Sequence, residues 1–139
     1  MGAGIEAMVI DSTNATFYAG IGDAYAVSPD SGVFKSTDGG VTWINTGLRG
    51  AAVNLLAIAL AQPGVVYAAT EGPGPRTFQG LFKSIDGGAS WAAITGLEDL
   101  IASRFHMTAL VVDPGNSSVV YAGTSGGTTL CDVGGGKGA

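Results

Sequence analysis

The sequence has few charged residues and almost none of the residue types that form cross-links or metal sites. Charged residues make up 12% of its 139 residues, with one cysteine, Cys131, and one histidine, His106. A single cysteine excludes an internal disulfide, and one cysteine with one histidine excludes a Cys/His zinc site within one chain. We therefore expect no metal and no cofactor.

The chain also lacks an excess of positive charge and a long apolar segment. Six Lys and Arg residues stand against eleven Asp and Glu residues, giving a net charge of −5, which disfavours a nucleic acid as partner. The longest apolar run, residues 51–61, is interrupted by Asn54 and falls short of the roughly 20 residues that cross a bilayer. No basic segment typical of a signal peptide opens the sequence as given, so the compartment stays open.

Glycine, by contrast, is abundant, with 24 residues, and 46% of the chain is hydrophobic. This content is too apolar for a disordered chain and suits one domain with a real core. Glycine together with many small and β-branched residues is typical of short strands joined by tight turns. The composition therefore predicts an all-β protein.

A ten-residue stretch, FKSTDGGVTW at residues 34–43, recurs 48 positions later as FKSIDGGASW at residues 82–91. Each copy is preceded by an apolar segment, a YAG or YAA segment and, directly before its FKS, the dipeptide GV or GL. This order indicates a repeated unit of four strands. We expect strand A at residues 5–10, 55–60 and 108–112, strand B at 16–20, 65–70 and 119–124, strand C at 33–36 and 81–84, and strand D at 42–45 and 90–94.

Strands A and B are apolar almost throughout, so both faces of each sheet should be buried. Four-stranded antiparallel sheets covered on both faces by their neighbours are the blades of a β-propeller. We predict a single partial propeller domain over residues 1–139 with about 2.75 blades: blade 1 at about 4–48, blade 2 at about 52–97 and an incomplete blade 3 at about 106–139. The tail aligns as a decayed third copy without its fourth strand, with Gly135 and Gly136 on the motif glycines.

We interpret residues 36–43 and 84–91, here called the two turn motifs, as structural. The paired glycines permit the positive φ that a tight turn requires. Asp38 and Asp86 are placed to accept hydrogen bonds from the amides of the turn, and the serine two residues earlier can hold its other side. Trp43 and Trp91 are expected to pack between neighbouring blades.

The pattern S-x-D-x-G-x-[TS]-W resembles the Asp-box, or BNR repeat. Both copies match at every specified position: Ser36, Asp38, Gly40, Thr42, Trp43 and Ser84, Asp86, Gly88, Ser90, Trp91. The larger unit is similar to propeller blades of sialidases, sortilin-type receptors, xyloglucan-cleaving glycosidases and Ycf48-type assembly factors. The resemblance covers roughly residues 5–136 and implies a propeller whose boxes lie at the blade periphery. It leaves the function open, since this group ranges from hydrolysis to scaffolding.

A functional site is expected at one end of the propeller. Successive antiparallel strands place the A–B and C–D turns at one end, the turn end, and the B–C and D–A loops at the other, the loop end. Polar and aromatic residues gather in these loops: Asp23, Tyr25, Asp30, Arg49, Glu71, Arg76, Phe78, Glu98, Asp99, Arg104, Phe105 and His106. We select as ligand-binding candidates Asp23, Tyr25, Glu71, Arg76 and Arg104.

No nucleophile–base arrangement is recognisable, so no catalytic residue is assigned. If the chain cleaved glycosidic bonds, Asp23 and Glu71 would be the pair of carboxylates. We interpret His106, at the start of a strand, as a turn or capping residue rather than a general base.

Propellers close with about four to eight blades, more than this chain supplies. We therefore expect a homo-oligomer, most simply a dimer forming a six-bladed ring, with a trimer, an open stack or a piece of a longer chain as alternatives. The residues favour a non-enzymatic module that binds a protein or carbohydrate partner through its loop end. The alternatives are a glycoside hydrolase-like protein acting on polysaccharide and an assembly or scaffold factor.

Overall fold

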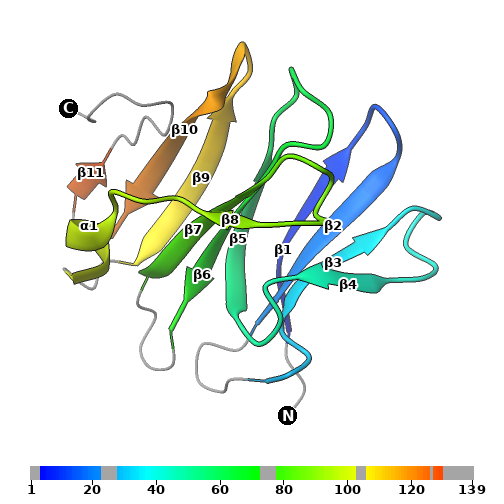
Figure 1. Cartoon of the computed structure of the whole chain (residues 1–139), viewed down its shortest axis with the longest axis horizontal. Helices are drawn as coiled ribbons and strands as arrows, with labels where there is room; N and C mark the ends of the chain where they lie inside the picture. Colours follow the sequence, from blue (N-terminus) through cyan, green and yellow to red (C-terminus); the bar gives the residue numbers. More distant parts are fainter. Residues whose placement is uncertain (1–3, 23–27, 73–77, 103–105, 126, 130–139) are drawn as a thin grey trace.

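The computed structural model describes residues 4–22, 28–72, 78–102, 106–125 and 127–129 of the chain. These residues form three antiparallel sheets that follow one another in sequence and lie side by side (Figure 1). The first sheet contains, in spatial order, β1 (Gly4–Asp11), β2 (Thr16–Gly22), β3 (Gly32–Ser36) and β4 (Ile44–Gly47).

The second sheet repeats this order with β5 (Ala52–Ile58), β6 (Val66–Glu71), β7 (Phe78–Ser84) and β8 (Ala92–Ala93). The third contains β9 (Met107–Asp113), β10 (Asn116–Thr124) and β11 (Gly127–Thr129). The predicted all-β fold of four-stranded antiparallel blades is confirmed. Gly135 and Gly136 of the expected decayed motif lie outside the described residues.

One helical turn was not predicted from the sequence. Helix α1 (Glu98–Ala102) lies in the connection between the second and third sheets, with Glu98 and Asp99 in its first turn, where acidic residues favour a helix. It is the one helix among the residues described, and no helix in that part of the chain is long and apolar enough to cross a membrane.

Strand D begins two residues later than the sequence suggests, at Ile44 instead of Thr42 and at Ala92 instead of Ser90. The reason lies in the turn motifs. The amides of Thr42 and Ser90 donate to the carboxylates of Asp38 and Asp86, so these residues still belong to the turn. The residues that pair with the preceding strand therefore lie after the residue that makes this hydrogen bond.

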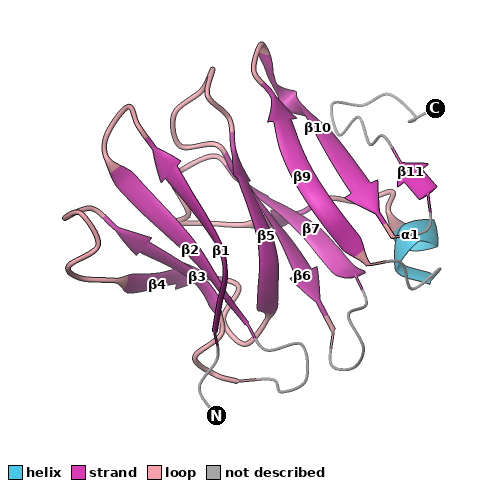
Figure 2. Ribbon diagram, turned by 180° about the vertical axis from the view of Figure 1, so that it is seen from behind, coloured by secondary structure: helices cyan, strands magenta, loops and turns pink. Residues whose placement is uncertain are grey.

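The hydrophobic core lies between the sheets, where β5 contacts both β1 and β9 (Figure 2). One cluster joins the first and second sheets through Tyr18, Val33, Val53, Leu56, Val66 and Ala68. A second cluster joins the second and third sheets, with Tyr67, Phe78, Leu81, Met107, Leu110 and Val120 among its members. The middle sheet is therefore covered on both faces, and all six residues of β6 are buried.

Both turn motifs make the same set of hydrogen bonds. In the first, the Gly40 amide donates to Ser36 Oγ at 2.9 Å, and the Ser36 hydroxyl donates to Asp38 Oδ1 at 2.8 Å. The corresponding distances in the second are 2.8 Å from the Gly88 amide to Ser84 Oγ and 2.8 Å from the Ser84 hydroxyl to Asp86. Each motif closes on itself, so it stabilises its own hairpin.

The second motif also holds the first sheet. The Lys35 amine donates to the Gly87 carbonyl at 3.1 Å and lies 5.7 Å from the centre of the Tyr18 ring. The indole of Trp91 covers Gly47, because a methyl group at Gly47 would come within 2.4 Å of the ring. The turn of one blade is thus packed on the outer strand of the blade before it.

The hydrogen bonds that Asp38 and Asp86 accept within the turn motifs make the stability of the fold depend on pH in the acid range. The largest effect comes from the hydroxyls of Thr42 and Ser90 and the next from the amides of the same residues. Together these hydrogen bonds lower the pKa of Asp38 and of Asp86 to about 2. A carboxyl with a lower pKa in the folded state than in the unfolded chain contributes stability above the unfolded pKa of about 4. The contribution is lost as the pH falls from about 4 to about 2.

We therefore expect the urea midpoint of the wild type to fall on acidification from about pH 5 to about pH 2. The double variant Asp38→Asn/Asp86→Asn should be less stable than the wild type at pH 5, and the difference should shrink towards pH 2. The double variant Glu6→Gln/Asp30→Asn, at two exposed residues, is the control for removal of two charges. An equal difference at both pH values would contradict the assignment.

Candidate functional site

Main-chain hydrogen bonds show which loops share an end of the structure. The Gly87 amide donates to the Gly64 carbonyl at 2.9 Å, which joins a C–D turn to an A–B turn. The Gly50 amide donates to the Ser31 carbonyl at 3.1 Å, which joins a D–A connection to the end of a B–C loop. The turn end and the loop end therefore lie at opposite ends of the sheets.

Of the five predicted ligand-binding residues, the structure describes Glu71. The others, Asp23, Tyr25, Arg76 and Arg104, lie outside the described residues. Glu71 is the last residue of β6 and lies at the loop end. Its side chain is only 5% exposed, which is unusual for a carboxylate and requires partners.

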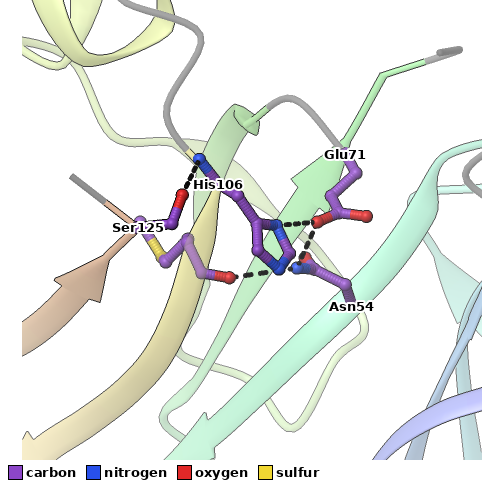
Figure 3. Close-up of polar contacts among 5 residues, drawn as sticks. Asn54, Glu71, His106 and Ser125 are labelled. Atoms are coloured by element: carbon purple, nitrogen blue, oxygen red, sulfur yellow. Dashed lines mark hydrogen bonds and ion pairs between the residues drawn. The ribbon is translucent and has the colours of Figure 1, made fainter. Parts of the chain in front are cut away.

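Glu71 has two polar partners, from two different sheets (Figure 3). Its Oε1 atom accepts a hydrogen bond from Asn54 Nδ2 at 2.9 Å and lies 2.5 Å from Nδ1 of His106. The Asn54 amide also approaches the Met107 carbonyl at 3.4 Å. We call Asn54, Glu71 and His106 the junction cluster, because it connects the second and third sheets.

The contact between Glu71 and His106 joins the end of β6 to the residue that precedes β9. Nδ1 of His106 is buried, and Glu71 is the polar group that the described residues bring to it. The main chain of His106 is fixed by Ser125, whose amide donates to the His106 carbonyl at 2.9 Å and whose Oγ accepts from the His106 amide at 3.3 Å. His106 thus joins two strand ends through its main chain, while its side chain makes a contact that the sequence did not predict.

The repeat shows that the fold does not require this polar pair. Strand pairing makes Gly22 the counterpart of Glu71, and the register at the start of β9 makes Ala52 the counterpart of His106. At the junction of the first two sheets Gly22 lies directly on Ala52, since a methyl group on Gly22 would come within 2.7 Å of the Ala52 Cα. A junction of two small residues is therefore sufficient in one place, and a buried acid–imidazole pair replaces it in the other.

Asn54 is held in place by a β-bulge. The pairing of β5 with β6 shifts between Val53 and Leu55, and the same irregularity occurs between Ile5 and Ala7 in β1 and between Met107 and Ala109 in β9. Bulges turn a side chain away from its place in the ladder and are common near functional sites. Glu6, Asn54 and Thr108 are the bulge residues, so each first strand presents a polar residue near the loop end.

Sequence reasoning missed Asn54 as a site residue, although it interrupts the longest apolar run. The signal was a polar residue at the same place in each repeat. Asn54 Oδ1 is buried and receives no hydrogen bond from any residue that the structure describes. Leaving a buried acceptor unpaired costs free energy, so a donor that reached this atom, from water or from a ligand, would stabilise the cluster.

Two other residues expected in the loops have different environments. Phe78 begins β7, where it pairs with Glu71 at the loop end, but it belongs to a strand and not to the loop and is 2% exposed in the core between the second and third sheets. Phenylalanine at a strand start packs inward because burial of its ring is strongly favourable. Arg49 lies in the loop end, where its Nε donates to the Pro29 carbonyl at 3.2 Å.

A separate groove lies at the turn end, between the first and second sheets. It has a volume of about 450 Å³ and is lined by Lys35, Thr37, Ile44, Asn45, Thr46 and Gly87, among others. Its one cation, Lys35, already donates to Gly87. Within the described ranges, no group of three or more His, Cys, Asp or Glu residues could hold a metal ion.

Comparison with known proteins identifies the class of fold. Solved structures similar to the chain include a GH74 enzyme from Niastella koreensis (19% identity, TM-score 0.70) and a GH74 xyloglucanase from Xanthomonas campestris (23%, 0.68). YCF48 from Cyanidioschyzon merolae is also similar (15%, 0.64). The alignments cover 99%, 98% and 99% of this chain, respectively.

All three are β-propeller proteins, so the chain has the fold of β-propeller blades. It spans 21% of the length of each GH74 structure and 36% of the YCF48 structure. No protein-family model and no curated protein matches the sequence.

The burial of the junction cluster leads to a stability prediction. Glu71→Ala leaves Asn54 Nδ2 without its nearest acceptor and removes the partner of His106, so unfolding should become easier by about 1–3 kcal/mol. Glu6→Ala is the matched control, because Glu6 is the exposed bulge residue of β1. Urea unfolding measures both changes, and similar losses for the two variants would show that the cluster does not stabilise the sheet junction.

Proposed function

We propose that the chain is a non-enzymatic Asp-box propeller module that binds a partner, in the first place a carbohydrate, through its loop end. The observation that carries the proposal is the junction cluster. A buried carboxylate, an imidazole and a carboxamide whose oxygen has no partner among the described residues meet where the equivalent junction has Gly22 and Ala52. Polar groups that the fold does not require point to a ligand.

The turn motifs support the Asp-box assignment in a structural role. Their aspartates accept hydrogen bonds from the same motif, and both motifs make the same contacts. They lie at the turn end, away from the junction cluster. The proposed ligand site therefore lies at the loop end and not at the two aspartates of the turn motifs.

The contacts of Glu71 favour binding over catalysis. Glycosidases generally use two carboxyl groups about 5–10 Å apart, one of them acting as a proton donor. The groups that the structure brings to Glu71 are an amide and an imidazole. The other carboxylate of the pair expected from the sequence, Asp23, lies outside the described residues.

A carbohydrate suits the groups at the loop end. Amide, carboxylate and imidazole side chains exchange hydrogen bonds with sugar hydroxyls, and the bulge residues Glu6 and Thr108 add polar groups at the equivalent places of the other sheets. The similarity to a GH74 xyloglucanase supports xyloglucan fragments as the first ligands to test. A peptide segment of a protein partner is the competing ligand class.

Titration calorimetry with xyloglucan oligosaccharides and a glycan array tests the proposal. Glu71→Gln keeps the size of the side chain but removes its charge, so we expect affinity to fall about tenfold, the cost of one hydrogen bond to a charged group. Asp113→Asn makes the same chemical change at the turn end and should bind as the wild type does. If the wild type binds and Glu71→Gln binds with the same affinity, the junction cluster is not the ligand site.

A glycoside hydrolase-like activity is the alternative that the two GH74 structures favour. A hydrolysis screen on polysaccharides separates it from binding alone. Turnover that disappears in Asp23→Ala or Glu71→Ala, with the fold retained by circular dichroism, would favour the enzyme.

A scaffold or assembly role is the second alternative, in keeping with the similarity to YCF48. It is distinguished by a specific protein partner in affinity capture together with an empty glycan array. Loss of that capture in Glu71→Gln would place the protein contact at the junction cluster.

A further inference from the structure

The repeat allows the same residue position to be compared in three sheets. Each sheet has a front face toward the following sheet and a back face toward the preceding one. The YAG and YAA segments align Tyr18, Tyr67 and Tyr121, and the strand pairing aligns their cross-strand partners Val9, Ala57 and Val111. Differences in exposure at these positions show which faces lack a cover.

Among the residues that the structure describes, the front face is covered in the first two sheets and exposed in the third. Tyr18 is 1% exposed and Tyr67 is 0% exposed, each covered by the sheet that follows, whereas Tyr121 is 42% exposed. The partner position shows the same change, since Ala57 is buried and Val111 is exposed. The front face of the third sheet is thus an apolar surface built like two buried ones.

The back face shows the opposite pattern. Leu56 and Leu110 are 7% and 8% exposed, each covered by the sheet that precedes it, whereas their counterpart Met8 in the first sheet is 50% exposed. Next to them, Val112 is buried while its counterpart Ile10 is exposed. The back face of the first sheet is therefore an apolar surface built like the back faces of the other two.

The two tryptophan side chains show the same difference between a covered and an uncovered sheet. Trp91 packs on Gly47 of the preceding sheet and, partly buried, packs against the core cluster there. Its counterpart Trp43 makes the same hydrogen bond to its own motif but belongs to neither core cluster of the described residues. Trp43 is thus positioned for a sheet that would precede the first one.

We propose that the front face of the third sheet binds the back face of the first sheet in a second copy of this chain. One chain presents both halves of the contact, and each half carries apolar side chains at positions whose counterparts are buried in the junctions within the chain. Monomeric proteins seldom leave contiguous apolar faces open. Two copies joined head to tail at both junctions supply six blades, within the range in which propellers close.

Analytical ultracentrifugation of the wild type and of two single variants tests this contact. Met8→Asp changes only the back face and Val111→Asp only the front face, at side chains that are exposed in the single chain. Each variant would bury an unpaired carboxylate in the contact, so self-association should weaken at least about 100-fold. Leu60→Asp, at an exposed residue of the turn between β5 and β6 of the middle sheet, is the matched control and should associate like the wild type.

Mixing the two variants tests the head-to-tail geometry. Met8→Asp keeps an intact front face and Val111→Asp an intact back face, so an equimolar mixture should regain one contact and form heterodimers. Circular dichroism of each variant establishes that the fold is retained. A monomeric wild type would overturn the proposal. So would self-association that only one of the two variants abolishes, because contact between like faces is then indicated.

Discussion

The structure depends on one constraint: a sheet that is apolar on both faces must be covered on both. The middle sheet satisfies it fully, since the first sheet covers the face with Leu56 and Val66 and the third covers the face with Tyr67 and Leu81. Burial of such side chains contributes about 1.5–3 kcal/mol each. The arrangement of the strands, the turns and the junction cluster all follow from stacking sheets in this way.

The turn motifs make this stacking possible from short strands. A two-residue strand such as β8 has little pairing of its own, so its position depends on the turn that precedes it. Ser84 and Asp86 fix that turn through the amides of Gly88 and Ser90, and the turn in turn places Trp91 on Gly47 of the preceding sheet. Local hydrogen bonding thus determines where a large aromatic ring enters the contact between blades.

The sequence predicted what depends on local chemistry and on repetition. Strands A and B are apolar runs and the turn motifs carry paired glycines, so the four-stranded unit could be recognised from letters alone. The sequence alone could not show that Thr42 belongs to the turn, because this depends on a hydrogen bond to Asp38. Nor could it show that Phe78 points into the core, or that Asn54 sits in a bulge, since both depend on strand register.

The junction cluster links a candidate site to the same packing. Glu71 and Asn54 belong to the second sheet and His106 directly precedes β9 of the third, so a ligand held by all three would bridge two blades. Such a ligand binds only when the blades are packed, and it therefore stabilises the packed state. Because Gly22 and Ser125 replace Glu71 in the other sheets, the repeat supplies one such cluster per chain. The proposed ligand would thus be held at the interface that joins the second and third sheets, where two small residues would be enough for packing.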